Sequence, residues 1–353
     1  MTSTCLITEK DDQEVVPFRT IQVHPSRKCN LSCLHCYSSS GPTMKAMLDI
    51  DALKKFLEYA YQNGFNNLSV SGGEPFLYDH LKELFSFSKK LGYRNNMVSN
   101  GMLLVSARNR EILEYVDLIA ISIDGKKELH DYIRGQDGAY EKMLQGVEVL
   151  RAQNKAWGFI HTITPQSWDS LLWLGAFAFE QGAKLLQLHP LEMYGRASTQ
   201  MADMTLQDTL RHQAYILANY LQAKYAGKMI IQLDLLHRDY LEAFPQVVNS
   251  FDRMCSKKGR LPDLLDNLVV EETGRIIPVA YGFNPVFSIG NVHDFGNHLF
   301  QQFIEEKIPD IRSLYFDTLV KILSNKEMDI INWSEILVKE SWRRSKSTTV
   351  VSI

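Results

Sequence analysis

The sequence predicts an α/β fold in which six strand–helix units form a parallel barrel or half-barrel, followed by a smaller α+β region. Two observations support this prediction. Short apolar runs alternate with amphipathic patterns from about residue 19 to 190, and the rhythm changes after residue 236. A crossover between parallel strands must cover a face of the sheet, so serial units place the helices outside the strands. The expected organisation is an extension over 1–18, a barrel over 19–236 and a C-terminal region over 237–353.

The barrel strands are predicted from runs rich in Val, Ile and Leu that end at Gly, Pro or Asn. These runs are TIQVHPS, NLSVSGG, NNMVSNG, DLIAISIDG, GFIHTIT and KLLQLHP. Helical patterns between them include 51–64, 80–92, 107–116 and 168–182. Chemistry is expected where the carboxyl ends of the strands and their loops meet.

The C-terminal part begins after a helical pattern over 205–226 and the strand MIIQLDLL. The run LVVEETGRIIPVAY predicts a hairpin with its turn at Thr273–Gly274. Helical segments are expected near 300–324 and 331–343. We expect this part to pack against the barrel.

Composition limits the possible functions. The 353 residues are 45% apolar and 22% charged, which is typical of a globular protein. The formal net charge of -3 argues against general binding of nucleic acid. The sequence has neither a basic start followed by an apolar run nor an apolar run of about 18 residues, so we expect a cytoplasmic protein without a membrane partner. Five cysteines, three of them clustered, are not a pattern typical of disulfides in that compartment.

The stretch CNLSCLHCYSS contains the clustered cysteines, Cys29, Cys33 and Cys36. Thiolates are soft ligands suited to iron–sulfur clusters or zinc, and this spacing lets one loop aim all three at one object. No fourth cysteine is near, so one iron of a cluster would stay open to an exogenous ligand. A zinc site completed by His24 or His35, or buried cysteines without a metal, are the alternatives.

Polar motifs follow two other predicted strands. Gly72–Pro75 comes after LSVS, where glycines permit a close backbone approach to a ligand and Glu74 offers a carboxylate to an ammonium group. A simple turn before a helix is the alternative. In DLIAISIDG, alternation places Ser122 and Asp124 on one face and the isoleucines on the other. Asp124 could instead cap a helix or turn.

Together these motifs resemble the radical S-adenosylmethionine (SAM) superfamily, in the cysteine spacing and in Gly72-Gly73-Glu74-Pro75, which is similar to its GGEP motif. The resemblance implies a partial (β/α)6 TIM-like barrel. It also implies that the cysteines hold a 4Fe–4S cluster whose open iron binds the amine and carboxylate of SAM. Electron transfer then cleaves SAM to methionine and a 5′-deoxyadenosyl radical, which abstracts hydrogen from a substrate.

The same resemblance implies further contacts with SAM. His35 would lie near the adenine, Ser122 and Asp124 near the ribose, and Arg134 of the HDYIRG stretch near the carboxylate. Ser99-Asn100-Gly101 resembles the family's TNG motif and is either support or a turn. Alternation along the fifth strand leaves open which face turns to SAM. The remaining expected cofactor contacts are Tyr37, Ser99, Asn100, His161, Leu188 and His189.

The segment LLQLHPLEMYGRA resembles the sixth-strand region of peptide-modifying members, which implies that Glu192, Tyr194 and Arg196 line a substrate mouth. Ordinary solvated loop residues are the alternative. Tyr281 is a further substrate candidate.

The C-terminal region resembles a SPASM or shorter twitch domain, which in many members holds auxiliary clusters. Cys255 to Gly259, the hairpin and Gly290–Asn291 fit that frame, but Val279 stands where a cysteine is expected. Only Cys255 and Cys5 remain, too few for a second cluster. We therefore expect a twitch-like scaffold without auxiliary-cluster cysteines and a single 4Fe–4S cluster, which favours redox-neutral radical chemistry.

The resemblance is closest to maturases of ribosomally made precursor peptides with nitrogen-fixation-like leaders, including spliceases that excise a tyrosine-derived unit. About 18 residues precede the first strand, so we expect a separate leader-recognition partner. An external electron donor of the flavodoxin or ferredoxin type is also implied. One alternative is a small-molecule enzyme of cofactor or tetrapyrrole biosynthesis. The other, a non-catalytic zinc module, is disfavoured by the GGEP, SIDG and RG motifs.

Overall fold

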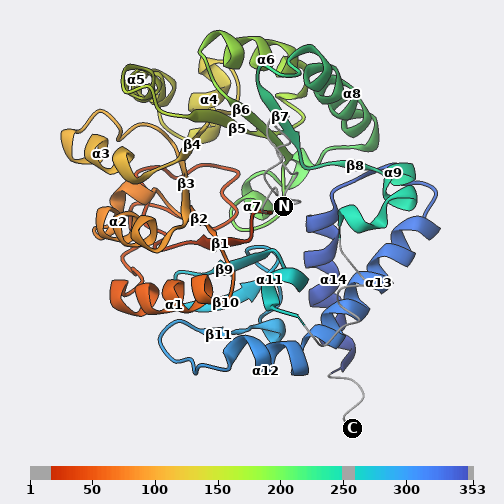
Figure 1. The fold of residues 1–353 in the computed structure, drawn as a ribbon. Coiled ribbons are helices and arrows are strands. Elements are labelled where there is room, and N and C mark those ends of the chain that lie inside the picture. Colours follow the sequence, from red (N-terminus) through yellow and green to blue (C-terminus); the bar gives the residue numbers. More distant parts are fainter. Residues whose placement is uncertain (1–16, 249–258, 349–353) are drawn as a thin grey trace.

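A computed structural model describes residues 17–248 and 259–348 of the chain. Its main sheet has ten strands in the order β11-β10-β9-β1-β2-β3-β4-β5-β6-β7. Figure 1 shows this sheet curving around the centre of the molecule with helices outside it. Within these ranges, no helix is both long enough and apolar enough to cross a membrane.

The six predicted parallel strands are confirmed, and a seventh, β7, continues the series. Each strand pairs in parallel with the next, so all their carboxyl ends lie at one edge. The strands are β1 (Thr20–Val23), β2 (Asn67–Val70), β3 (Arg94–Ser99), β4 (Leu118–Ser122), β5 (Trp157–Ile163), β6 (Leu185–Pro190) and β7 (Ile230–Leu233).

Capping residues mark some of the boundaries of the helices between these strands. The Asp49 carboxylate accepts a hydrogen bond from the Ala52 amide at the start of α1, and Gly92, with φ +104°, ends α2. The helices of this part are α1 (Ile50–Gln62), α2 (Leu81–Leu91), α3 (Ala107–Ile112), α4 (Lys127–Arg134), α5 (Ala139–Ala152), α6 (Leu171–Glu180), α7 (Ala197–Gln200) and α8 (Asp208–Lys224).

Side chains on β4 alternate between two environments, as expected. Ile119, Ile121 and Ile123 belong to the main apolar core, whereas Ser122 is half-buried on the other face. The neighbouring strand shows which face meets the helices, because Ile121 pairs with Phe159 and Phe159 stacks on Phe177 of α6. The opposite face of the strands therefore lines the barrel interior.

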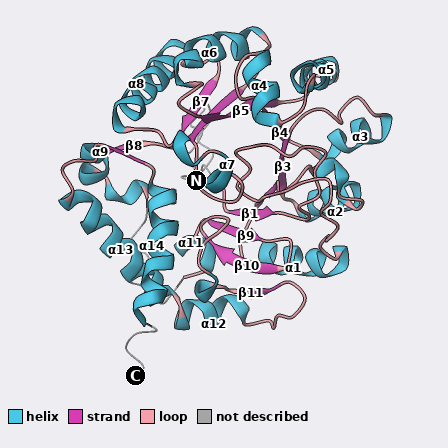
Figure 2. Ribbon diagram, turned by 180° about the vertical axis from the view of Figure 1, so that it is seen from behind, coloured by secondary structure: helices cyan, strands magenta, loops and turns pink. Residues whose placement is uncertain are grey.

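The C-terminal hairpin joins the barrel sheet. β9 (Asn267–Val270) and β10 (Arg275–Pro278) form the predicted hairpin, and β9 pairs in parallel with β1, which the sequence did not indicate. Figure 2 shows β9 beside β1 and β10 on the far side of β9. One sheet thus runs through both regions, and their division at residue 236 stays a prediction.

The expected helical segment near 300–324 is two helices. The break falls at Lys307, directly before a helix whose first turn contains proline, a position where proline is tolerated. The remaining elements are β8 (Leu236–His237), α9 (Arg238–Ala243), α11 (Leu261–Leu264), β11 (Gly290–Asn291), α12 (Leu299–Glu306), α13 (Ile308–Ser324), β12 (Ile330–Ile331) and α14 (Trp333–Thr348).

Candidate functional site

The loop after β1 gathers three cysteine side chains. Cys29 and Cys33 are buried and Cys36 is half-buried, and all three pack with Leu31 and Met102 in one small cluster. All three are free thiols. The loop therefore brings together the three ligands that the sequence predicted.

Each of these sulfur atoms accepts a hydrogen bond, and such donors favour the thiolate. Burial acts in the opposite direction and raises the pKa of Cys29 to about 12. A metal overcomes this cost, because coordination deprotonates a thiol. The donor–acceptor distances are Leu31 N to Cys29 Sγ, 3.4 Å; Ser40 N to Cys36 Sγ, 3.3 Å; and Arg134 Nη1 to Cys33 Sγ, 3.8 Å.

The donor set fits an iron–sulfur cluster. Each thiolate of a 4Fe–4S cluster binds a different iron, so the three cysteines would each hold a separate iron of such a cluster. Across residues 17–248 and 259–348, no three His, Cys, Asp or Glu side chains converge on a single-ion site. The histidines proposed to complete a zinc site have other partners, since His24 stacks on Tyr281 and His35 lies 2.9 Å from Asp124.

The two glycines after β2 pack against the cysteine loop. Gly73 donates its amide to the Ser26 carbonyl at 2.9 Å, and a Cβ on Gly73 would collide with the backbone of Lys28. Gly72 has a φ of +103°, and a Cβ there would lie 2.7 Å from the Ser26 oxygen. The close approach expected toward a ligand is therefore made, in this structure, toward the loop that carries the cysteines.

Glu74 is buried beside this contact with its carboxylate surrounded by donors. It accepts from Ser99 Oγ at 2.9 Å, the Asn100 amide at 2.9 Å and the Phe76 amide at 3.3 Å. Burial outweighs these donors and raises the pKa of Glu74 to about 7. Asn100 also donates to the Asn30 side chain at 2.8 Å, so the third-strand motif supports both Glu74 and the cysteine loop.

Asp124 links the end of β4 to two other predicted site residues. Its carboxylate lies 2.5 Å from Arg134 Nε and 2.9 Å from His35 Nε2, and its amide donates to His130 Nδ1. Despite burial, the Arg134 charge and the hydrogen bond with His35 hold the pKa of Asp124 well below its usual range. Asp124, Arg134, His35 and Cys33 thus form one connected polar group.

Two expected SAM contacts lie on the helix-facing side of the sheet. His161 shares the Phe159 face of β5 and pairs with Leu188, and both are fully buried. His161 lies 2.8 Å from the Ile123 carbonyl and 3.1 Å from Ser167 Oγ. At the carboxyl ends of β5 and β6, the residues that face the barrel interior are instead Thr162 and His189, which are paired in register.

The interior faces of β6 and β7 carry a polar group that joins the predicted His189 to Asp234, a residue that the sequence did not single out. Asp234 lies 3.7 Å from His189 Nδ1 and accepts from Gln187 at 3.4 Å and Gln232 at 3.2 Å. Asp234 raises the pKa of His189 against the effect of burial. Burial also raises the pKa of nearby Glu192. The sequence signal for this group is that QLH (187–189) and QLD (232–234) each place two polar residues on one face of a strand. The signal can be recognised only when β6 and β7 are known to be neighbours.

Tyr37 and Tyr281, expected to contact cofactor and substrate, lie together. Tyr281 stacks on His24 with ring centroids 4.6 Å apart, and Tyr37 meets Tyr281 edge-on at 5.4 Å. The adjacent Val279, with φ +72°, sits at a tight turn in which the Ala280 amide donates to the Pro278 carbonyl. The position where the resemblance expected a cysteine is thus strained backbone beside an aromatic group.

Tyr194 and Arg196 follow β6. Tyr194 packs against the main core, and Arg196 binds the backbone of the cysteine loop. The roles of all these residues toward SAM or substrate stay predictions. Cys5 and Cys255 lie outside the described residues.

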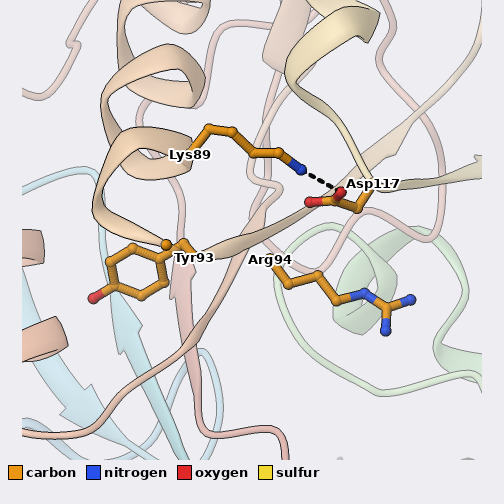
Figure 3. Close-up of a pocket in the computed structure, with 5 residues that line it drawn as sticks. Lys89, Tyr93, Arg94 and Asp117 are labelled. Atoms are coloured by element: carbon orange, nitrogen blue, oxygen red, sulfur yellow. Dashed lines mark hydrogen bonds and ion pairs between the residues drawn. The ribbon is translucent and has the colours of Figure 1, made fainter.

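A surface pocket lies far from these residues, at the amino ends of β3 and β4. It is lined by Lys89, Gly92, Tyr93, Arg94 and Asp117, and Figure 3 shows the Lys89–Asp117 ion pair across it. None of the predicted site residues lines this pocket.

Residues 23–177 match the family model of the radical SAM superfamily. An AdoMet-dependent heme synthase from Methanosarcina barkeri is 32% identical over 175 residues, covering 48% of this chain and 49% of the relative. The antilisterial bacteriocin subtilosin biosynthesis protein AlbA of Bacillus subtilis is 27% identical over 132 residues, covering 35% of this chain and 29% of the relative. The chain therefore matches half or less of these curated relatives.

The fold is also similar to a solved structure. The crystal structure of Streptococcus suis SuiB bound to S-adenosylmethionine superposes with a TM-score of 0.65 at 18% identity, covering 84% of this chain and 68% of that chain. Likeness at this identity concerns the fold alone. The family match to the radical SAM superfamily covers residues 23–177, which include the cysteine loop and the motifs that follow β2, β3 and β4.

Proposed function

We propose that this chain is a radical SAM enzyme that binds one 4Fe–4S cluster through Cys29, Cys33 and Cys36 and modifies a precursor peptide by hydrogen abstraction. The observation that supports this most is the cluster of three buried or half-buried thiols at the carboxyl edge of a parallel sheet. When bound, the cluster and SAM supply a strongly oxidising organic radical.

In this proposal, residues of the chain itself bind SAM and orient its polar groups. Glu74 is the carboxylate available to the ammonium group of SAM, and its donors hold it in a fixed position. Asp124 orients Arg134, whose guanidinium also approaches Cys33. The interior-facing His189 and Asp234 form a polar wall on the side of β6 and β7.

The enzyme proposal is tested by anaerobic reconstitution with iron and sulfide. We expect a broad visible absorbance and 5′-deoxyadenosine from SAM plus reductant. Cys33→Ala should remove both, whereas Ser86→Ala, which removes a hydroxyl on the outer helix α2, should change neither. A non-catalytic zinc module would give neither signal in the wild type.

The peptide substrate is supported by the relatives. AlbA is named for bacteriocin biosynthesis, and a further SuiB structure is bound to the precursor peptide SuiA. We extend this to a cytoplasmic maturase with a separate leader-recognition partner, a flavodoxin- or ferredoxin-type electron donor, and backbone splicing of a tyrosine-derived unit. Co-expression with a neighbouring precursor gene should yield a peptide of altered mass, dependent on Cys33.

The second candidate is a small molecule of tetrapyrrole type. The heme synthase of Methanosarcina barkeri, at 32% identity, favours it. The two candidates make opposite predictions in the same strain. An unchanged precursor peptide together with Cys33-dependent turnover of an iron porphyrin precursor would select this one.

A further inference from the structure

Arg196, at the end of the loop that follows β6, binds the cysteine loop directly. Its Nε donates to the Cys33 carbonyl at 2.8 Å, its Nη2 to the Ser40 carbonyl at 2.6 Å, and its amide to the Cys36 carbonyl at 2.9 Å. Two of these three acceptors belong to proposed cluster ligands. The contacts join segments that lie 163 residues apart at Cys33.

The contact with Ser40 bears on the ligand itself. The Ser40 carbonyl accepts a hydrogen bond from Arg196, and the Ser40 amide donates to Cys36 Sγ at 3.3 Å. Ser40 therefore links Arg196 to the sulfur of a proposed cluster ligand. Its hydroxyl lies 2.7 Å from Ser38 Oγ, which lies 3.5 Å from the same sulfur. A change in the orientation of Ser40 would therefore alter the hydrogen bonding of Cys36.

Gly195 brings the two loops into backbone contact. Its φ is +55°, and a Cβ there would collide with the Tyr37 carbonyl and lie 2.6 Å from the Cys36 oxygen. A side chain at this position would separate the loops. Gly195 therefore permits the approach that Arg196 completes.

We propose that Gly195 and Arg196 form a clamp that holds the cysteine loop in its ligating conformation. This makes Arg196 a positioning residue of the cluster, in contrast to the substrate contact that its sequence context implied. Arginine suits the task because its planar fork reaches two carbonyl groups at once, whereas the single ammonium of lysine does not. The cluster role rests on the proposed function, but the clamp itself can be tested without a cluster.

The experiment compares Arg196→Gln and Arg196→Lys with the wild type and with Arg151→Gln, an exposed arginine on α5 as the matched control. Reconstituted proteins are exposed anaerobically to an iron chelator, and the rate of cluster loss is followed. Outer partners of metal ligands typically change metal affinity about 10–100-fold. We therefore expect at least about tenfold faster loss for Arg196→Gln, a smaller increase for Arg196→Lys, and no change in the control.

Hydrogen exchange of the metal-free proteins supplies the independent readout. Peptides covering residues 33–41 should exchange faster in Arg196→Gln and in Gly195→Ala, while core peptides from β4 stay protected. Cluster loss at the wild-type rate with unchanged exchange in 33–41 would overturn the clamp. If the wild type binds no cluster at all, the proposed function fails, and the exchange data still decide whether the clamp exists.

Discussion

Glu74 is the residue whose ionisation should make SAM binding depend on pH. Burial raises its pKa from 4.5 to about 7, and an ammonium ligand favours the ionised form. Binding below pH 7 must therefore displace a proton, and SAM affinity should rise about tenfold per pH unit up to that value. Calorimetry of the reconstituted protein at several pH values measures this slope. Equal affinity at pH 6 and pH 8, or an unchanged slope in Glu74→Gln, would contradict the assignment.

The His189–Asp234 pair gives a second titration. Asp234 raises the pKa of His189 above 6.5 and has its own pKa lowered below 3.8. The ion pair therefore stabilises the folded state fully between pH 3.8 and pH 6.5. This stabilisation is lost as the pH rises through the folded-state pKa of His189 or falls through that of Asp234.

Asp234→Asn should lower the pKa of His189, because it removes the carboxylate while the burial remains. Nitrogen-detected NMR of the histidine rings across the pH range measures the shift, with Asp203→Asn, an exposed carboxylate, as the control. A His189 titration that is the same in Asp234→Asn and the wild type would show that the pair does not interact.

Site residues within one short motif could be predicted from the sequence. Residues whose place in the site depends on which strands are neighbours could not. Cys29, Cys33 and Cys36 share one loop, so their spacing was enough to predict their proximity. His161 was different, since alternation gives two faces without saying which one meets the helices. Asp234 could be recognised only once β7 was known to lie beside β6.

A buried carboxylate, that of Asp131, stabilises the connection between α4 and α5. This connection follows α4, the helix that carries Arg134. Asp131 accepts hydrogen bonds from the Gly138 and Tyr140 amides, each at 2.8 Å. Asp131→Ala would leave both amides without this partner, so we expect a loss of about 2–4 kcal/mol in the free energy of unfolding, since hydrogen bonds to charged groups contribute about 1.5–3 kcal/mol each and are not fully additive. Urea unfolding measures the loss.

Asp137→Ala is the matched control for this element, because Asp137 is an exposed carboxylate in the same connection. It should change the unfolding midpoint little. Equal losses in the two variants would indicate that the Asp131 hydrogen bonds do not stabilise the connection.

Elements with strong local signals were predictable. Helices α1, α2, α3, α6 and α8 lie where the helical patterns of the sequence predicted them. The hairpin was also predicted, but its partner was not: β9 pairs with β1, about 250 residues earlier, and no local pattern specifies such a register.

For the molecule as a whole, the pairing of β9 with β1 brings the end of the hairpin to the aromatic group beside the cysteine loop. Val279 occupies the position where the resemblance implies a further cysteine, and it lies in a strained turn. The Val279 carbonyl accepts a hydrogen bond from Asn267 Nδ2 at 2.5 Å. The free thiols of the described residues are Cys29, Cys33 and Cys36. Within these residues, only one cluster site is therefore supplied with thiolates.

We accordingly expect about four irons per chain after anaerobic reconstitution, the content of a single 4Fe–4S cluster. Cys255→Ser should leave this number unchanged, because two remaining cysteines, Cys5 and Cys255, are too few to hold a second cluster by conventional ligation. Replacing Cys29, Cys33 and Cys36 together by alanine should remove all bound iron. A wild-type content of about eight irons, falling to about four in Cys255→Ser, would instead mean that the C-terminal region binds an auxiliary cluster with unusual ligands.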